Sequence, residues 1–123
     1  MSAAPISTAP ALSFDPADPV ALTQALVRCP SVTPEEGGAL ALLDAVLSAE
    51  GYDVHRPVFS EPGTPDVENL YARIGSSAPV FVIAGHTDVV PVGDAAAWTR
   101  EPFGGAIENG TLYGRGACDM KGG

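Results

Sequence analysis

Between Thr33 and Gly51, apolar residues recur at the three- and four-residue intervals of a helix. Thr33 can cap this helix, with Pro34 at its first position and an acidic first turn at Glu35 and Glu36. Gly51 can end it in the left-handed conformation. The apolar residues on its inner face are Leu40, Leu43, Val46 and Leu47.

Other apolar patterns predict strands. Residues 52–59 and 67–74 each have the composition of a strand, and a Pro- and Gly-rich loop at 60–66 separates them. The uninterrupted apolar run at 79–84 is typical of a parallel strand that is buried on both faces. We expect that strand to end directly before a polar loop.

Capping and turn residues predict two further elements. A helix is expected from Pro19, behind a capping Asp18, to about Arg28. The Asn109-Gly110 pair is a strong signal for a hairpin turn. The strands that this turn joins are expected at residues 104–108 and 111–113. Helices and strands together predict an α/β fold.

Potential metal ligands follow the apolar run at 79–84. His86 and Asp88 stand two residues apart, and in an extended backbone such residues point to the same side. One group can ligate a divalent metal while the other orients the imidazole through its second nitrogen. A lone His-x-Asp is more often ordinary loop chemistry, and so is an acid such as Asp119 among glycines. Their occurrence in one ordered series favours a shared site.

From Ala21 to Gly123 the chain resembles a known family. This family comprises zinc-dependent amidohydrolases and exopeptidases, among them aminoacylases, acetylornithine deacetylases, glutamate carboxypeptidases and desuccinylases. Similar segments also lie at residues 26–36 and 68–73. The specific motifs are His86-Thr87-Asp88 and Gly114-Arg115-Gly116-Ala117-Cys118-Asp119-Met120-Lys121-Gly122.

The resemblance implies a role for each polar residue of the two motifs. His86 is expected to ligate one zinc ion, and Asp119 to bridge two zinc ions through its two carboxylate oxygens. Asp88 is expected to contribute to catalysis by holding the His86 ring and raising its basicity. The implied cofactor is two Zn²⁺ per complete subunit, with Co²⁺ as a possible substitute.

The resemblance also implies residues that the chain does not supply. In the family, a general-base Glu, a neighbouring Glu ligand, a further acidic ligand and a late His all follow the second motif. We therefore expect an amino-terminal fragment, with residues 19–123 forming part of a mixed-sheet, zinc-peptidase-like catalytic domain with flanking helices. Such a fragment should expose strand edges and an uncovered apolar face.

A particular activity is implied more weakly. Gly93-Asp94, Trp98 and Pro102-Phe103 resemble the desuccinylase branch. That branch hydrolyses an N-succinyl amide and releases succinate and diaminopimelate for lysine and cell-wall synthesis. The alternatives are another deacylase or carboxypeptidase of the family, or a non-catalytic chain that binds metal weakly. The implied partner is a small N-acyl amino acid, and the complete protein is expected to form a homodimer.

Composition narrows the remaining possibilities. The net charge of −9 disfavours nucleic acid and anionic membranes as partners. No apolar run is long enough for a signal-peptide core or a membrane span. Residues 1–18, rich in Ala and Pro, are expected to form a mobile tail. Cys29 and Cys118 lie far apart, which predicts reduced thiols in the cytoplasm.

Five other positions could carry function, and a structural role is the preferred interpretation of each. Cys118 is expected to be a small buried filler and His55 to lie on a solvated face. Trp98 and Phe103 are expected to anchor a long loop, and Arg115 to pair with loop carbonyls. Residues 121–123 are expected to open the next helix, whose start could favour anions.

Overall fold

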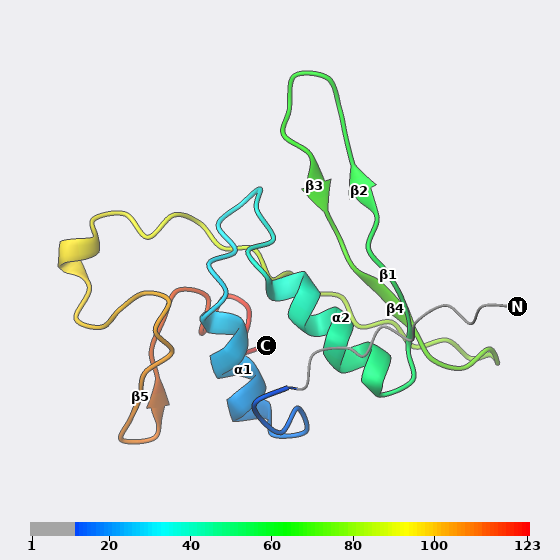
Figure 1. Cartoon of the computed structure of the whole chain (residues 1–123), viewed down its shortest axis with the longest axis horizontal. Helices are drawn as coiled ribbons and strands as arrows, with labels where there is room; N and C mark the ends of the chain where they lie inside the picture. The colour runs from blue at the N-terminus through cyan, green and yellow to red at the C-terminus, as the bar shows by residue number, and fades with distance from the viewer. Residues whose placement is uncertain (1–11) are drawn as a thin grey trace, which may run out of the picture.

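Two helices and three small two-stranded antiparallel sheets make up the regular structure of residues 12–123, the part of the chain that the computed structural model describes (Figure 1). A short 3₁₀ turn precedes the last of these sheets. The elements are α1 (Pro19–Val27), α2 (Ala39–Ala49), β1 (Asp53–His55), β2 (Val58–Phe59), β3 (Val67–Glu68), β4 (Tyr71–Arg73), η1 (Ala95–Ala97), β5 (Ile107–Glu108) and β6 (Thr111–Leu112). The prediction of mixed helices and strands is confirmed, but the described residues form only two-stranded sheets rather than one mixed sheet.

The first helix is capped as its sequence predicts. The Asp18 carboxylate accepts hydrogen bonds from the backbone N–H groups of Val20, at 2.9 Å, and Ala21, at 3.3 Å. Pro19 occupies the first helical position and Arg28 is the carboxyl-terminal cap. Of the predicted tail, residues 1–11 lie outside the described residues. Residues 12–18 form bends and turns that lead into α1.

The second helix begins six residues later than the predicted cap at Thr33. Gly37 and Gly38 have φ values of +57° and +92°, which a helix cannot contain, so α2 starts only at Ala39. Thr33 instead donates its backbone N–H to the Val89 carbonyl at 3.1 Å. A bond to a distant segment therefore overrides the local preference of Thr33 for capping.

Glu36 takes over the capping role at the start of α2. Its carboxylate accepts hydrogen bonds from the N–H groups of Gly38, Leu40 and Ala41, at 3.0, 2.8 and 3.3 Å. These groups belong to the first turn, where helical N–H donors lack partners within the helix. The negative charge also lies at the positive end of the helix dipole.

Gly51 ends α2 in the left-handed conformation that the sequence predicts, with φ at +87°. Its N–H donates to the Ser48 carbonyl, and the N–H of Tyr52 donates to the Leu47 carbonyl at 3.0 Å. This pair of bonds is the Schellman motif, which satisfies the last free carbonyls of a helix.

Each of the two predicted strands after α2 is divided into two short pieces. Residues 52–59 form β1 and β2, and residues 67–74 form β3 and β4. β1 pairs with β4, and β2 with β3, so the four pieces make one long antiparallel hairpin that projects from the helices (Figure 1). The division lies at Arg56-Pro57, where proline has no N–H to offer the ladder.

The prediction of a buried parallel strand at residues 79–84 is wrong for the described chain. No residue of this run belongs to a strand, and the side chains of Phe81 and Ile83 are both 88% exposed. A strand needs a neighbouring backbone to take up its N–H and C=O groups, and residues 12–123 offer this run none. The expectation of an uncovered apolar face is thus confirmed.

The hairpin predicted around Asn109-Gly110 is confirmed with shorter strands than predicted. Asn109 and Gly110 have φ values of +49° and +76°, as a type I′ turn requires at both central positions. Ile107 pairs with Leu112, and Glu108 with Thr111. The hairpin follows the long loop that contains η1.

The buried apolar core joins the two helices to the loop after His86. Leu26 and Val27 come from the end of α1, and Val89 comes from that loop. Val32 and Val89 also form an isolated parallel bridge, which fixes their backbones together. The other buried apolar residues, all in α2, are Ala39, Leu40 and Val46.

A first prediction concerns the cap of α2. Glu36→Ala should lower the free energy of unfolding by about 1 kcal/mol, because three N–H groups lose their acceptor. Glu35→Ala is the matched control, since Glu35 is exposed and caps no helix in residues 12–123. Denaturant unfolding followed by far-UV circular dichroism measures both variants. Equal stability of the two variants would contradict the assignment of Glu36 as the cap.

Candidate metal centre

The side chains of His86 and Asp119 meet although 33 positions separate them in the chain. The distance between His86 Nε2 and Asp119 Oδ1 is 3.1 Å. Two ligands of one tetrahedral zinc ion, each about 2.1 Å from the metal, lie about 3.4 Å apart. The spacing of the two donor atoms therefore fits a shared metal ion.

Asp88 approaches the opposite side of the same imidazole ring. His86 Nδ1 lies 3.1 Å from the backbone carbonyl oxygen of Asp88 and 3.3 Å from its carboxylate oxygen Oδ1. The sequence-based expectation that Asp88 holds the ring agrees with this geometry. When Nδ1–H donates to Asp88, the lone pair of a neutral imidazole is on Nε2 and faces Asp119.

The number of N–H groups on the imidazole favours a proton or a metal ion between His86 and Asp119. Both ring nitrogens face oxygen acceptors, but a neutral imidazole has only one N–H to donate. Either the ring carries a second proton or a metal ion occupies the place of that proton. The pKa of His86 is raised, mainly by the hydrogen bond to the Asp88 carbonyl and further by the charges of Asp88 and Asp119, with partial desolvation opposing.

Loops and turns, rather than strand ends, position these side chains. His86 and Asp88 follow the exposed run at 79–84, and Asp119 lies in consecutive turns at residues 115–122. The expectation that a strand at residues 79–84 ends directly before His86 and Asp88 is therefore wrong for the described residues. Residues 121 and 122 belong to the end of these turns.

Two ligands do not complete a metal site. Within residues 12–123, no group of three or more His, Cys, Asp or Glu side chains is arranged to hold a metal ion. The Asp119 side chain is 86% exposed, so its carboxylate is open to further partners. The roles of His86 and Asp119 as ligands, and of Asp88 as the orienting residue, remain predictions.

Two residues near the site form hydrogen bonds to distant backbone carbonyls. The hydroxyl of Ser31 donates to the Thr87 carbonyl at 2.6 Å, and Lys121 Nζ donates to the Cys29 carbonyl at 2.8 Å. Burial lowers the pKa of the Lys121 ammonium. Lys121 lies within the second motif, but only its burial distinguishes it from an ordinary loop lysine.

The structure tests the other candidate residues. Trp98 anchors its loop as expected, since its Nε1–H donates to the Val92 carbonyl at 2.9 Å. The Arg115 guanidinium lies over the Trp98 ring and donates to the Pro91 carbonyl, which confirms pairing with a loop carbonyl. His55 is exposed beside Asp53, as a solvated face requires. The expectation of a buried Cys118 is wrong, because that residue is exposed in the turns around Asp119.

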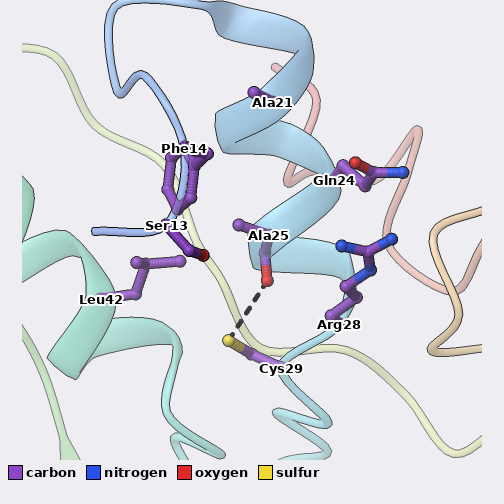
Figure 2. A pocket seen from close by; sticks show the side chains of 8 residues that line it. All are labelled: Ser13, Phe14, Ala21, Gln24, Ala25, Arg28, Cys29 and Leu42. Carbon is purple, nitrogen blue, oxygen red and sulfur yellow. Dashed lines mark hydrogen bonds between the residues drawn. The ribbon is translucent and has the colours of Figure 1, made fainter. Parts of the chain in front are cut away.

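A hollow of about 460 Å³ between α1 and α2 is a separate feature (Figure 2). Phe14 and Leu42 line one side, and Gln24 and Arg28 extend from α1. None of the three metal-site residues lines this hollow. The Cys29 thiol donates to the Ala25 carbonyl, and burial raises its pKa, so it is a poor nucleophile. The hollow therefore offers no chemistry that competes with the metal centre.

Within the described part of the chain, no helix combines the length and the apolar composition that crossing a bilayer requires.

The geometry agrees with the family to which the chain is similar. The model of peptidase family M20/M25/M40 matches residues 82–123, which contain His86, Asp88 and Asp119. Over these residues the chain is similar to this family, whose members depend on metal ions. The matched segment corresponds to part of a peptidase-type domain.

Curated relatives point to one branch of the family. The succinyl-diaminopimelate desuccinylase of Methylobacterium nodulans is 70% identical over 105 residues, which are 85% of this chain and 26% of the relative. The desuccinylase of Rhodospirillum centenum is 62% identical over 106 residues, or 86% of this chain and 28% of the relative. The desuccinylase of Rhodopseudomonas palustris is 60% identical over 106 residues, which are 86% of this chain and 27% of the relative. The chain spans about a quarter of the length of these relatives.

A second prediction concerns the protonation of His86. In a His55→Ala background, which leaves His86 as the only imidazole, NMR titration of the metal-free chain should give a pKa above the ordinary histidine value. Asp119→Asn should lower that pKa, because it removes a carboxylate that favours the imidazolium. An unchanged titration in this variant would contradict the contact between the two side chains.

The sign of the accompanying pH effects follows from the raised pKa. The contribution of the imidazolium to folding is fully present below the ordinary pKa and is lost as pH rises through the raised one. Zinc binding should have the opposite pH dependence, because Nε2 must be free of its proton to ligate the metal. Zinc affinity, measured by competition with a chelating dye, should therefore fall as pH decreases through the His86 pKa.

Proposed function

We propose that this chain supplies part of the metal site of a succinyl-diaminopimelate desuccinylase. The reaction is hydrolysis of N-succinyl-LL-2,6-diaminopimelate to succinate and LL-diaminopimelate. The observation that carries the proposal is the 3.1 Å approach of His86 Nε2 to Asp119 Oδ1, in a segment 70% identical to a named desuccinylase. Imidazole and carboxylate together are a donor set that suits zinc.

The proposed assignments follow from the chemistry of each side chain. His86 would hold one ion through Nε2, and Asp119 would hold two because its two oxygens can each face a different cation. Two zinc ions, or cobalt ions in their place, supply a polarised amide carbonyl and an activated water when bound. The exposure of Asp119 leaves its carboxylate accessible to the second ion and to the substrate.

Asp88 acts on the reaction through His86. Its carbonyl and carboxylate oxygens accept a hydrogen bond from Nδ1–H, which fixes the tautomer and makes Nε2 the better ligand. The general base and the remaining ligands are assigned to no residue of this chain. Catalysis would therefore need the length of polypeptide that the relatives possess.

Three further features belong to the same proposal. The substrate is a small N-acyl amino acid, the complete protein acts as a homodimer, and it works in the cytoplasm. Another deacylase or carboxypeptidase of the family would use the same half-site with a different acyl pocket. A chain that only binds metal weakly is the non-catalytic alternative, favoured by the presence of only two adjoining ligands in residues 12–123.

A third prediction separates metal binding from catalysis. The 123-residue chain alone, with zinc added, should not hydrolyse succinyl-diaminopimelate, because the base and several ligands are absent from it. It should still bind zinc weakly, and His86→Ala should abolish that binding while His55→Ala leaves it unchanged. Succinate release and zinc titration measure the two properties. Turnover near that of a full-length relative, abolished by His86→Ala, would contradict the incomplete-site assignment.

A fourth prediction ranks the two carboxylates in a full-length chain that carries this segment. Asp119→Ala should remove both metal ions and abolish turnover, because the loss of a bridging carboxylate leaves two cations in mutual repulsion. Asp88→Ala should weaken metal affinity or activity by about 10–100-fold, as expected for a residue that acts on a ligand. Elemental analysis and turnover are measured for both variants. The roles are reversed if Asp119→Ala keeps two zinc ions while Asp88→Ala loses both.

A further inference from the structure

Only two side chains are both polar or charged and buried in residues 12–123. Ser31 is 0% exposed and Lys121 is 5% exposed. The two residues are far apart in the chain, yet both take part in contacts of the loop at residues 29–33, which follows α1. That loop lies between the two segments that carry the metal ligands.

Ser31 joins this loop to the segment that carries His86 and Asp88. Its hydroxyl donates to the Thr87 carbonyl at 2.6 Å, so the bond falls on the residue between the two functional side chains. The backbone adds two bonds, because Val89 N–H donates to the Ser31 carbonyl at 2.9 Å and Thr33 N–H donates to the Val89 carbonyl. The segment at 87–89 is thus held along its length.

Lys121 joins the same loop to the segment that carries Asp119. Its ammonium donates to the Cys29 carbonyl at 2.8 Å, and its backbone N–H donates to the Gly116 carbonyl at 2.8 Å. The second bond closes the turns that contain Asp119. Among residues 12–123, no carboxylate forms an ion pair with the Lys121 ammonium.

A buried ammonium in this position is energetically unfavourable unless it has a defined partner. Removing a charged group from water costs several kcal/mol, whereas a methionine of similar length could fill the same volume without that penalty. The bond to the Cys29 carbonyl gives the charge a partner and gives the turns a directional attachment. Apolar packing alone would not define that attachment so narrowly.

We infer that residues 29–33 clamp the two halves of the metal centre, and that Ser31 and Lys121 are the positioning residues through which the clamp holds them. This inference rests on the proposed function of His86 and Asp119 as metal ligands. Functional constellations tolerate displacements of only about 0.5 Å. Two ligands on separate loops need a third element that fixes both, and residues 29–33 contact both.

The test compares two clamp variants with a matched control in a full-length chain that carries this segment. The clamp variants are Ser31→Ala and Lys121→Met. The control is Gln24→Met, because the Gln24 amide also donates to a distant carbonyl, that of Gly105 at 2.7 Å, but touches neither half of the site. Thermal unfolding of the metal-free proteins measures the loss of stability in all three.

The first readout is the position of His86 without metal. In protein labelled with ¹³C-histidine, both clamp variants should shift the His86 ring resonances, while Gln24→Met leaves them at the parent position. Lys121→Met is the more informative variant, since Lys121 is attached to the opposite half of the site. Unshifted His86 resonances in both clamp variants would overturn the inference.

The second readout is the affinity and absorption spectrum of Co²⁺. Each clamp variant should weaken Co²⁺ affinity by about 10-fold and change its visible spectrum, as expected for displaced ligands. The loss of Co²⁺ affinity in the double variant should be smaller than the product of the two single losses. Either substitution alone already releases one half of the metal centre from residues 29–33. If the clamp variants lose as much stability as Gln24→Met and still bind Co²⁺ with the affinity and spectrum of the parent protein, Ser31 and Lys121 have only a structural role.

The two readouts separate this inference from the proposed function. A parent protein that binds Co²⁺ but does not release succinate contradicts the desuccinylase assignment and leaves the clamp intact. A parent protein that binds no metal contradicts the metal centre itself, and the His86 resonances then still decide whether residues 29–33 hold the two segments together.

Discussion

The pairing of residues 31–33 with Val89 is the contact on which the arrangement of this chain depends. It brings the loop after α1 beside the loop after His86, and it buries Ser31 and Val89 between them. The same valine touches the turns of the second motif, because a Cβ at Gly116 would lie 2.7 Å from Val89 Cγ1. Three segments that are remote in the chain therefore meet at one side chain, and the proposed metal ligands lie on two of them.

The glycines of the second motif have a packing role that complements the chemistry of Asp119. A Cβ at Gly114 would lie 2.3 Å from Val27 Cγ1, so the turns can approach α1 only without a side chain there. Gly116 combines a similar close approach to Val89 with a φ of +85°. The motif thus contains one proposed metal ligand and two glycines that allow its loop to reach the core.

Long-range pairing explains where the chain departs from its local preferences. Thr33 is a good helix cap, but its backbone N–H is bonded to Val89, and the left-handed glycines that follow delay α2 until Glu36 can cap it. The run at 79–84 has the composition of a buried strand but lacks a neighbouring backbone among residues 12–123. The composition of this run indicates side chains that are normally buried. It does not show which segment would bury them.

The sequence by itself determined those features whose physical cause lies within a few residues. The Asp18 cap, the left-handed end at Gly51 and the Asn109-Gly110 turn are of this kind. Motif order also predicted a shared site for His86, Asp88 and Asp119, whose side chains lie in contact in the structure. Only the tertiary structure decided that Ser31 holds Thr87 and that Lys121 holds Cys29. These bonds span 56 and 92 positions and leave no periodic or local signal, because each partner is a backbone carbonyl that any residue could provide.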